Sequence, residues 1–370
     1  MSKETTIIII GAGASGIAMG CQLQRKLNFT DFEIYEKDVE FGGTWWVNTY
    51  PGCACDILSH FYSFSFEQNP DWSKVFPAQP EIHEYMVKVA EKYNLRAHTH
   101  FSTECLGADW DKQTEGWTVH FKNLKTGENF SKTCQFLVLC QGALSVPNDC
   151  PVPGLENFKG DAFHSARWNH KVDLTNKDVI VIGNGCSATQ FVPVILPKTK
   201  TLTQFIRSPH WIFERYNWEY PAAFKWVMKH VPGAMSLYRL FWAVFLDPFF
   251  LAFKKEGIGK WWRKRTEKDS REYIMRTAPK KYHELLIPKF EVGAKRRIFD
   301  GYYLPCLNDP KMLLTNDPLV QIKERTVLTK SGKEYPADVI VYANGFKVQE
   351  PLVPMIIRGK SGEDLRSRWK

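Results

Sequence analysis

Two glycine-rich segments of the chain have the spacing that lets a backbone approach phosphate groups closely. The first, GAGASG at residues 11–16, follows four consecutive isoleucines and precedes a run that favours a helix. In a G-x-G-x-x-G loop the first glycine forms a tight turn, the second admits a pyrophosphate and the third lets helix and strand pack closely. The N-terminus of the helix then faces the negative charge. The residues predicted to bind this pyrophosphate are Gly11, Gly13, Ser15 and Gly16.

An acidic residue follows at the distance that this motif requires. The predicted strand 32–35 ends at Glu36, twenty residues beyond Gly16. A carboxylate in this place accepts hydrogen bonds from the hydroxyls of a ribose. We therefore expect Glu36 to bind the ribose of the first nucleotide.

The second glycine-rich segment, GNGCSA at residues 183–188, is followed by the opposite charge. Its third glycine position is alanine, which loosens the contact between helix and strand slightly but keeps the motif. The next predicted strand ends at Arg207 and Ser208. Arginine pairs with the 2′-phosphate that a carboxylate would repel, so this site should prefer NADPH to NADH. The predicted binding residues here are Gly183, Gly185, Ser187, Ala188, Arg207 and Ser208.

Two sites with opposite ribose chemistry imply two different dinucleotides, FAD at the first and NADPH at the second. A buried strand at 136–140 leads into a proline-rich stretch where the chain leaves the first domain, and a strand within 338–346 brings it back. We therefore predict an α/β fold with two Rossmann-like domains, the NADPH domain being inserted in the FAD domain. The predicted boundaries are 1–150 and 343–370 for the FAD domain, 151–210 and 287–342 for the NADPH domain and 211–286 for a helical insertion.

Composition and charge exclude several classes of protein. With 370 residues, of which 44% are apolar and 24% charged, the chain is neither disordered nor collagen-like nor a coiled coil. A net charge of +9 suits an anionic surface or cofactor, but no nucleic-acid-binding signature accompanies it, so we expect no nucleic-acid partner. The nine cysteines lack paired metal spacing, which predicts reduced thiols and no metal site.

The termini and the most apolar stretch bear on localisation. The first ten residues lack the basic region and the cleavage site of a signal peptide. The stretch 234–253 is interrupted by Arg239, Asp247 and Pro248, so we expect it to fall short of a spanning helix. These features predict a cytoplasmic protein without a transmembrane segment. They leave open a peripheral contact with a membrane, and they do not indicate an oligomeric state.

Two further motifs carry a resemblance to a known family. Residues 158–168, FKGDAFHSARW, match the pattern F-x-G-x-x-x-H-x-x-x-W, and residues 43–56 match G-x-W-x-x-x-x-[FY]-P-G-x-x-x-D. With the two dinucleotide motifs, the chain resembles the type I Baeyer–Villiger monooxygenases and their flavin-containing relatives from about Ile7 to Phe346. Trp168 favours the Baeyer–Villiger branch, since the branch that oxidises heteroatoms usually has Tyr or Phe there. Asn169 departs from the family's Pro or Asp.

The resemblance implies roles for several charged residues. Arg296 would be the catalytic arginine, with a shift of one residue onto Arg297 left open, and Lys295 would assist at the NADPH 2′-phosphate. Asp56 would orient the arginine, and His164 would couple the domains. Without the family, the same residues read as a turn residue, a buried hydrogen bonder and a solvated basic face. The remaining cofactor-binding residues that the resemblance implies are Gly43, Thr44, Trp45, Tyr50 and Asp56.

The implied reaction is a monooxygenation that uses FAD, NADPH and O2 and proceeds through a C4a-peroxyflavin. The expected substrate is a lipophilic ketone, such as a polycyclic ketone of secondary metabolism, and the product an ester or lactone. Aromatic residues crowd 211–286, where the family has a helical insertion beside its substrate pocket, although core packing explains them equally well. The alternatives are flavin-dependent hydroxylation, N- or S-oxidation, and uncoupled NADPH oxidation that releases peroxide.

The C-terminal part departs most from the family pattern. Only 24 residues follow Phe346, Asn344 stands in place of the usual Thr, and Lys347 replaces a frequent Asp. The chain is thus expected to be a fragment, a naturally truncated product, or a member whose flavin site another chain completes. If the flavin is held weakly, an inactive nucleotide-binding paralogue is the remaining alternative.

Overall fold

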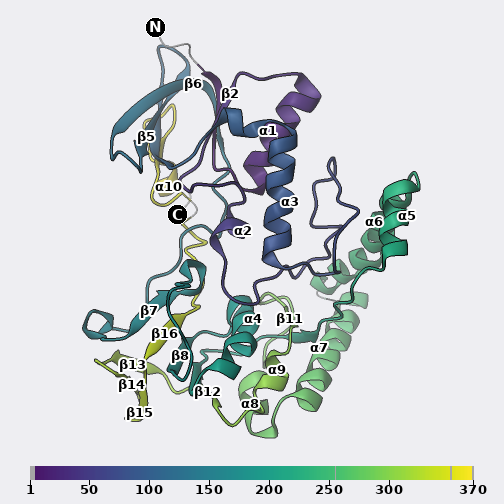
Figure 1. The fold of residues 1–370 in the computed structure, drawn as a ribbon, viewed down its shortest axis with the longest axis vertical. Coiled ribbons are helices and arrows are strands. Elements are labelled where there is room, and N and C mark those ends of the chain that lie inside the picture. The colour runs from purple at the N-terminus through teal and green to yellow at the C-terminus, as the bar shows by residue number, and fades with distance from the viewer. Residues whose placement is uncertain (1–4, 255, 351, 369–370) are drawn as a thin grey trace. The chain divides into compact units, whose positions relative to one another are not determined.

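The computed structural model describes residues 5–254, 256–350 and 352–368, which form two compact units (Figure 1). Unit 1 consists of Met1–Val47, Pro80–Pro147 and Phe346–Lys370, and unit 2 of Asn48–Gln79 and Asn148–Gly345. Each unit contains parallel strands and one glycine-rich loop, so the predicted α/β fold with an inserted second domain is confirmed. Residues 48–79 group with unit 2, whereas the sequence analysis assigned them to the first domain.

Unit 1 is built on a seven-stranded sheet whose β1 lies between two parallel neighbours. β1 pairs with β2 and β6, β2 pairs with β3, and β17 pairs with β4, all in parallel, whereas β4, β5 and β6 are antiparallel. In sheet order the strands are β17 (Ile356–Arg358), β4 (Thr103–Asp111), β5 (Gly116–Asn123), β6 (Asn129–Leu139), β1 (Thr5–Ile10), β2 (Phe32–Tyr35) and β3 (Thr99–His100).

The helices of unit 1 are amphipathic where they meet the sheet. α1 (Ala14–Leu27) buries Ile17, Cys21 and Leu23 on one face, as the helical period requires. It ends at Asn28, whose left-handed φ of 49° closes the last turn. The other helices of unit 1 are α2 (Thr44–Val47), α3 (Gln79–Lys92, of which Gln79 is assigned to unit 2), the 3-10 helix η1 (Leu95–His98) and α10 (Leu365–Arg368).

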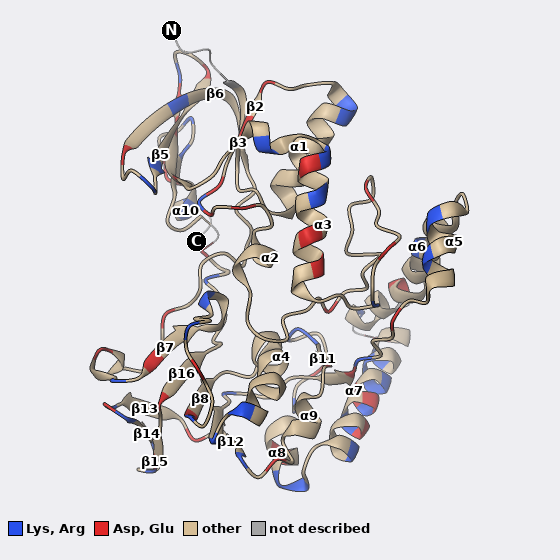
Figure 2. Ribbon diagram, in the orientation of Figure 1, with Lys and Arg blue, Asp and Glu red and all other residues tan. Residues whose placement is uncertain are grey.

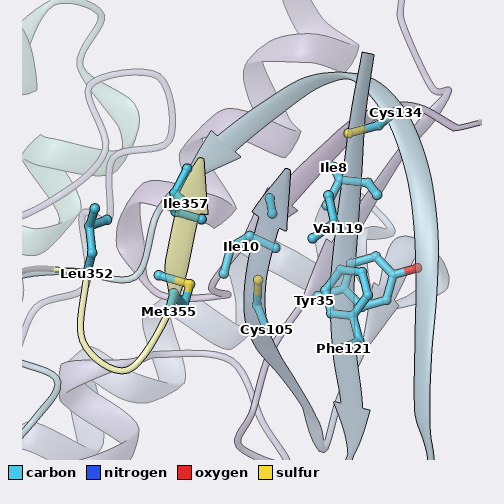
Figure 3. Packing of buried hydrophobic residues seen from close by; sticks show 11 residues of the cluster. Ile8, Ile10, Tyr35, Cys105, Val119, Phe121, Cys134, Leu352, Met355 and Ile357 are labelled. Carbon is cyan, nitrogen blue, oxygen red and sulfur yellow. The ribbon is translucent and has the colours of Figure 1, made fainter. Parts of the chain in front are cut away.

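The core of unit 1 combines both ends of the chain. Ile8 and Ile10 of β1 pack in one cluster with buried residues of β4 and β5 (Figure 3). Leu352, Met355 and Ile357, which are at most 4% exposed, belong to the same cluster. Complete burial of such a side chain stabilises a fold by about 1.5–3 kcal/mol. The segment after Phe346 is therefore part of the hydrophobic core.

Unit 2 contains a five-stranded sheet in which all strands are parallel. Its order is β12 (Met312–Thr315), β9 (Thr201–Phe205), β8 (Asp178–Ile182), β16 (Val339–Tyr342) and β7 (Asp161–His164). All five residues of β8 are buried, which agrees with the apolar run that follows Asp178 in this strand. Around this sheet lie α4 (Cys186–Ile195), α9 (Tyr303–Cys306), η2 (Leu155–Asn157), η3 (Ser165–Arg167), η4 (Leu196–Lys198) and an antiparallel sheet of β13 (Leu319–Ile322), β14 (Thr326–Thr329) and β15 (Glu334–Pro336).

A helical insertion, which the sequence predicted, is confirmed between two short parallel strands. β10 (Ile212–Glu214) pairs with β11 (Ile298–Asp300), and the insertion leaves from one and returns to the other. Its helices are α5 (Ala222–His230), α6 (Ala234–Leu246), η5 (Asp247–Phe253), α7 (Ile258–Thr277), η6 (Lys280–Tyr282) and α8 (His283–Leu286).

The apolar stretch 234–253 differs from the expectation. We expected three residues to interrupt it, but helical turns continue from α6 into η5 at Asp247. By length and composition alone these 20 residues, with a mean hydropathy of 1.4, would suffice to cross a membrane, and none of that apolar window is buried. Core helices and signal sequences of other proteins have the same length and composition.

Candidate cofactor and active site

The first glycine loop lies between β1 and α1 and needs its glycines for steric reasons. A Cβ on Gly16 would lie 1.9 Å from the carbonyl oxygen of Gly11, so no side chain fits at the start of α1. Gly13 is the N-cap of α1, and it provides no side-chain cap to the first helical N–H groups. Those backbone N–H groups can donate hydrogen bonds to the oxygens of a pyrophosphate. The loop therefore fits the phosphates of a dinucleotide.

Glu36 follows β2 and is 6% exposed. Its carboxylate accepts a hydrogen bond from the backbone N–H of Ala12 at 2.7 Å and one from that of Asp38 at 2.9 Å. Burial raises the pKa of Glu36, although both hydrogen bonds act in the opposite direction. The carboxylate thus fixes the glycine loop itself, in addition to the ribose contact that we predict.

The tryptophan-containing motif is divided between the two units. Gly43, Thr44 and Trp45 belong to unit 1, where a Cβ on Gly43 would lie 3.0 Å from the Cα of Gly13. This part of the motif therefore packs directly on the first glycine loop. Tyr50 and Asp56 belong to unit 2.

The second half of this motif is attached to α4. The hydroxyl of Tyr50 donates to Oε1 of Gln190 at 2.9 Å, and Nε2 of Gln190 donates to the carbonyl of Ala54 at 3.0 Å. Gly52, with a φ of 80°, lies so close to α4 that a Cβ would be 2.7 Å from the carbonyl oxygen of Gln190. These contacts explain why residues 48–79 group with unit 2. The sequence analysis missed Gln190, because no motif singles it out.

The second glycine loop repeats the geometry of the first between β8 and α4. Gly183 has a φ of 116°, and a Cβ there would meet the carbonyl oxygen of Ala343 at 2.4 Å. Gly185 is the N-cap of α4, and a Cβ on it would meet no atom within 4 Å. The open space beside Gly185 is what a phosphate needs in order to approach. Ser187 bonds to Tyr50, and Ala188 is completely buried.

Three residues that we predicted for the 2′-phosphate of NADPH lie together. Nζ of Lys295 donates to Oγ of Ser208, although the two residues are far apart in the sequence. Burial lowers the pKa of Lys295, and the charge of Arg207 lowers it further. Within the part of the chain that the structure describes, no carboxylate forms an ion pair with either cation. Two such cations and a hydroxyl form a set that fits a dianionic phosphate.

Arg296 forms an ion pair with Asp56 within unit 2. Its Nη2 donates to the two carboxylate oxygens of Asp56 at 2.8 and 2.7 Å. Burial acts to lower the pKa of Arg296, but the charge and hydrogen bonds of Asp56 together with the nearby Cys186 and Cys55 outweigh it, so that the pKa is raised. The Asp56 side chain is 19% exposed and that of Arg296 is 60% exposed, so the arginine is held on one side and open on the other.

Arg297 has a different environment from its neighbour. Its guanidinium lies over the rings of Phe213 and Phe249, at 5.9 and 5.4 Å from their centroids. Burial lowers the pKa of Arg297. In this structure it is therefore Arg296, not Arg297, that contacts Asp56.

A cavity of about 290 Å³ lies beside Arg296 and Arg297. It has a charged end formed by the basic segment and an apolar wall formed by the helical insertion. The lining residues are Phe249, Ala252, Phe253, Thr266, Val292, Gly293, Lys295, Arg296 and Arg297. The sequence analysis missed Phe249 as an individual residue, since it was one of many aromatic residues in the insertion.

Two histidines support the loops around the site. His164 is 4% exposed; its Nδ1 accepts from the N–H of Ala166 at 3.0 Å, and its Nε2 lies 3.1 Å from the carbonyl oxygen of Gly345. Burial lowers the pKa of His164, which favours a neutral ring that donates from Nε2. His210, which we did not predict, forms a hydrogen bond with the backbone of Arg296, and burial lowers its pKa too.

The predicted site residues are divided between the two units. Unit 1 holds Gly11, Gly13, Ser15, Gly16, Glu36, Gly43, Thr44 and Trp45, and unit 2 holds Tyr50, Asp56, Gly183, Gly185, Ser187, Ala188, Arg207, Ser208, Lys295 and Arg296. Within the described residues, no cluster of His, Cys, Asp and Glu is arranged to hold a metal ion.

Comparisons with known proteins identify the family. Residues 4–232 match the FMO-like family, described as "Flavin-binding monooxygenase-like". The chain is 35% identical to the FAD-binding monooxygenase BOA2 of Botryotinia fuckeliana, over 98% of this chain and 70% of that protein. It is 33% identical to a Baeyer–Villiger monooxygenase of Pseudomonas aeruginosa, over 100% of this chain and 68% of that protein.

Solved structures agree with the sequence relatives. The structure titled "Oxidized steroid monooxygenase bound to NADP" superposes with a TM-score of 0.84 at 28% identity, over 99% of this chain and 76% of that one. Cyclohexanone monooxygenase from Rhodococcus sp. Phi1 bound to NADP+ gives a TM-score of 0.85 at 25% identity, over 99% and 76% of the two chains. The chain therefore belongs to the flavin-binding monooxygenase-like family. It is a monooxygenase that uses FAD and NADPH, which confirms both predicted cofactors.

Proposed function

We propose that this protein carries out the Baeyer–Villiger oxidation of a lipophilic ketone. In this reaction ketone, O2, NADPH and a proton give an ester or lactone, NADP+ and water. The observation that carries the proposal is the pair of Arg296 and Asp56 beside a cavity with an apolar wall. The names of the relatives in Botryotinia fuckeliana and Pseudomonas aeruginosa support the same class of reaction.

Arg296 supplies a fixed positive charge where negative charge develops on the ketone oxygen during the addition. A preorganised cation of this kind stabilises such a transition state. Asp56 engages Nη2 of Arg296, and an arginine has five N–H donors, so donors remain for the substrate. By holding the guanidinium, Asp56 removes the need to order it during the reaction.

The bound flavin would supply the redox chemistry, since it accepts a hydride from NADPH and reacts with O2. The residues that would hold it are the glycine loop at 11–16, Glu36 and the segment 43–45. NADPH would be held by the loop at 183–188 and by Arg207, Ser208 and Lys295. This assignment rests on the steric and charge fit of the two loops.

Substrate class and compartment follow from the same residues. Phe249, Phe253 and Val292 form an apolar wall of the cavity, which supports a lipophilic ketone as the substrate. The nine free cysteines support a reducing compartment, and we propose that the protein works in the cytoplasm.

The test uses the full chain loaded with FAD. The first step is an absorption spectrum before and after anaerobic NADPH, in which bleaching of the flavin bands is expected. The second is turnover of a panel of lipophilic ketones under labelled O2, in which the ester should retain one labelled oxygen. Labelled alcohols, N-oxides or S-oxides in place of esters would overturn the Baeyer–Villiger assignment. Peroxide without product would overturn oxygenation.

A variant connects the product to the proposed residue. Arg296→Ala should keep FAD and should still be reduced by NADPH, but its ester formation should fall by about 100-fold or more, as when one oxyanion donor is removed. Arg265→Ala on α7 is the matched control, because Arg265 is exposed and its ion pair within the described residues is with Asp269 of the same helix. An Arg296→Ala variant with normal product yield would contradict the assigned role.

A further inference from the structure

A row of large apolar side chains points outward from α6. Leu237, Leu240, Phe241, Val244 and Phe245 are 66%, 58%, 59%, 65% and 55% exposed. Their spacing of three and four residues places them on one face of the helix. In a water-soluble domain this face would be turned toward the core, so the orientation is the reverse of the usual one.

The opposite face of α6 is anchored to other segments of unit 2. The guanidinium of Arg239 donates to the carbonyl oxygen of His60, and the hydroxyls of Tyr238 and Tyr220 lie 3.1 Å apart. The ring of His60 lies 5.1 Å from that of Tyr238. Arg239 is therefore occupied on the inner face and does not interrupt the outward apolar row. Because α6 is fixed along its inner side, its apolar side stays exposed and can contact another surface.

The exposed apolar surface continues onto neighbouring elements. Phe250 and Phe253 of η5 are 74% and 66% exposed, and Trp261 of α7 is 61% exposed. Trp226 of α5 is 58% exposed. We call the outward side chains of α5, α6, η5 and the start of α7 the α6 face. Tryptophan at the border of an apolar patch is typical of the interface between a membrane and water.

The segment that carries the α6 face is basic, with ten Lys and Arg but only three Asp and Glu at residues 222–268. Arg239 and Arg263 of this segment are turned inward to backbone carbonyls, and Lys229, Arg265 and Lys268 pair with carboxylates. Lys254, Lys260 and Lys264 are exposed, and within the described residues no carboxylate forms an ion pair with them. Figure 2 shows Lys and Arg along α7 and on α5. Apolar residues surrounded by lysines are complementary to a bilayer with anionic headgroups, which takes up the side chains and attracts the charges.

We propose that the α6 face docks on the surface of an anionic lipid bilayer, with α6 lying in the plane of the interface. Lysine is depleted at contacts between proteins, which makes a protein partner a poorer match to this basic segment. A second copy of the chain would bring two basic segments together, and like charges in an interface oppose association. We expect α6 to stay on the surface of the bilayer and not to cross it, because crossing would break the contacts of Tyr238 with Tyr220 and of Arg239 with His60.

Vesicle co-sedimentation of the FAD-loaded full chain tests this docking. Vesicles of phosphatidylcholine with about one third phosphatidylserine should bind the protein at least tenfold more strongly than pure phosphatidylcholine, since each basic residue near such a surface adds attraction. Added salt should weaken the binding, because it screens the charges.

Two variants separate the apolar and the charged contributions. The double substitution Leu240→Asp with Phe241→Asp should reduce binding to both kinds of vesicle, because it places carboxylates in the apolar row that would enter the bilayer. Lys260→Glu with Lys264→Glu should reduce binding to the anionic vesicles only. Leu27→Asp is the matched control, since Leu27 is 69% exposed but lies on α1 of unit 1. All these positions are exposed, and circular dichroism would verify that each variant is folded.

Three results would overturn the proposal. One is that the wild type binds neither kind of vesicle. Another is that the Leu240→Asp, Phe241→Asp variant binds as tightly as the wild type. The third is that the wild type is a dimer without affinity for vesicles and that the same variant makes it monomeric, which would assign the face to a second copy. Binding is measured without turnover, so its failure and the failure of ketone oxidation can be told apart.

Discussion

In unit 1 the strand after the glycine loop is followed by a buried carboxylate, Glu36, whereas in unit 2 the equivalent strand, β9, is followed by the exposed cation Arg207. Glu36 binds to its own loop through the N–H groups of Ala12 and Asp38. The charges of unit 2 are gathered from different parts of the chain, since Lys295 reaches Ser208 across the sequence. The two loops therefore share a geometry that fits a pyrophosphate, and they differ in the charge that follows at the end where we propose the ribose to bind.

The two units therefore differ in whether neighbouring or distant parts of the chain form the proposed ribose site. The proposed selectivity of unit 1 is local, because the carboxylate that fixes the loop is also the group that we propose for the ribose. The selectivity of unit 2 depends on tertiary structure, because the segment with Lys295 follows the whole helical insertion. Substitutions in unit 1 should therefore affect the loop itself, whereas those in unit 2 should change affinity and leave the loop in place.

The largest effect should come from Gly16→Ala. The new methyl group would overlap the carbonyl oxygen of Gly11, which is backbone and cannot move aside without opening the loop. We expect FAD binding to be lost, measured as flavin absorbance retained after desalting. NADP+ binding by unit 2, measured by calorimetry, should persist.

Gly185→Ala is the matched substitution in the other loop. Its methyl group would meet no protein atom within 4 Å, so the fold should be unaffected, but it would occupy the space that a phosphate needs. NADP+ binding should be lost and FAD retained. If Gly16→Ala retained FAD, or Gly185→Ala retained NADP+, the assignment of the loops to the two cofactors would be wrong.

A smaller effect is expected from Arg207→Ala. Removing one charge-assisted contact to the 2′-phosphate should weaken NADPH binding by about 10- to 100-fold, which corresponds to about 1.5–3 kcal/mol. The affinity for NADH, which lacks this phosphate, should stay the same. Dissociation constants of both nucleotides for wild type and variant provide the measurement, and an equal loss for NADH would exclude a contact with the 2′-phosphate.

Glu36→Gln examines the carboxylate through the pH dependence of stability. Burial raises the pKa of Glu36 above its ordinary value of 4.5, so the folded protein binds this proton more tightly than the unfolded chain does. The contribution of Glu36 to the free energy of unfolding is therefore greatest below pH 4.5, its ordinary pKa, and declines as the pH rises through the raised pKa of the folded protein. The glutamine variant has no such proton. The advantage of the wild type over the variant in urea unfolding should shrink with rising pH, and an advantage that grows would contradict the direction of the shift.

The sequence alone was sufficient for the parts of the molecule that depend on local spacing. The glycine loops, Glu36 and the strands beside them follow from residues that are close in the chain, and the structure has them in the expected strand–turn–helix units. The family resemblance supplied Asp56 and Arg296, which no local pattern connects. Their contact is a product of the tertiary fold.

The rest could not be predicted because it depends on which face of an element is covered. The sequence of α6 shows an apolar helix, but only the structure shows that Tyr238 is turned inward and that Leu240 is turned outward. For the same reason, the bonds of Gln190 that attach residues 48–79 to α4 were missed. Hydrophobic periodicity identifies an apolar stripe along a helix, but it does not show whether that stripe faces the core or the surface.

The smallest effect should come from Ala188→Gly, which gives the second loop the third glycine of the first. Ala188 is completely buried in the first turn of α4, where its methyl group already fits. Glycine should lower the free energy of unfolding by about 1–2 kcal/mol, through lost helix propensity and one lost buried methyl group. The NADPH affinity should change by less than about threefold, or about 0.7 kcal/mol, since the methyl group is completely buried and the backbone of residue 188, through which we expect it to bind, is kept. A loss of affinity of tenfold or more would instead mean that this methyl group positions the loop, and the third position would then be as decisive in unit 2 as Gly16 is in unit 1.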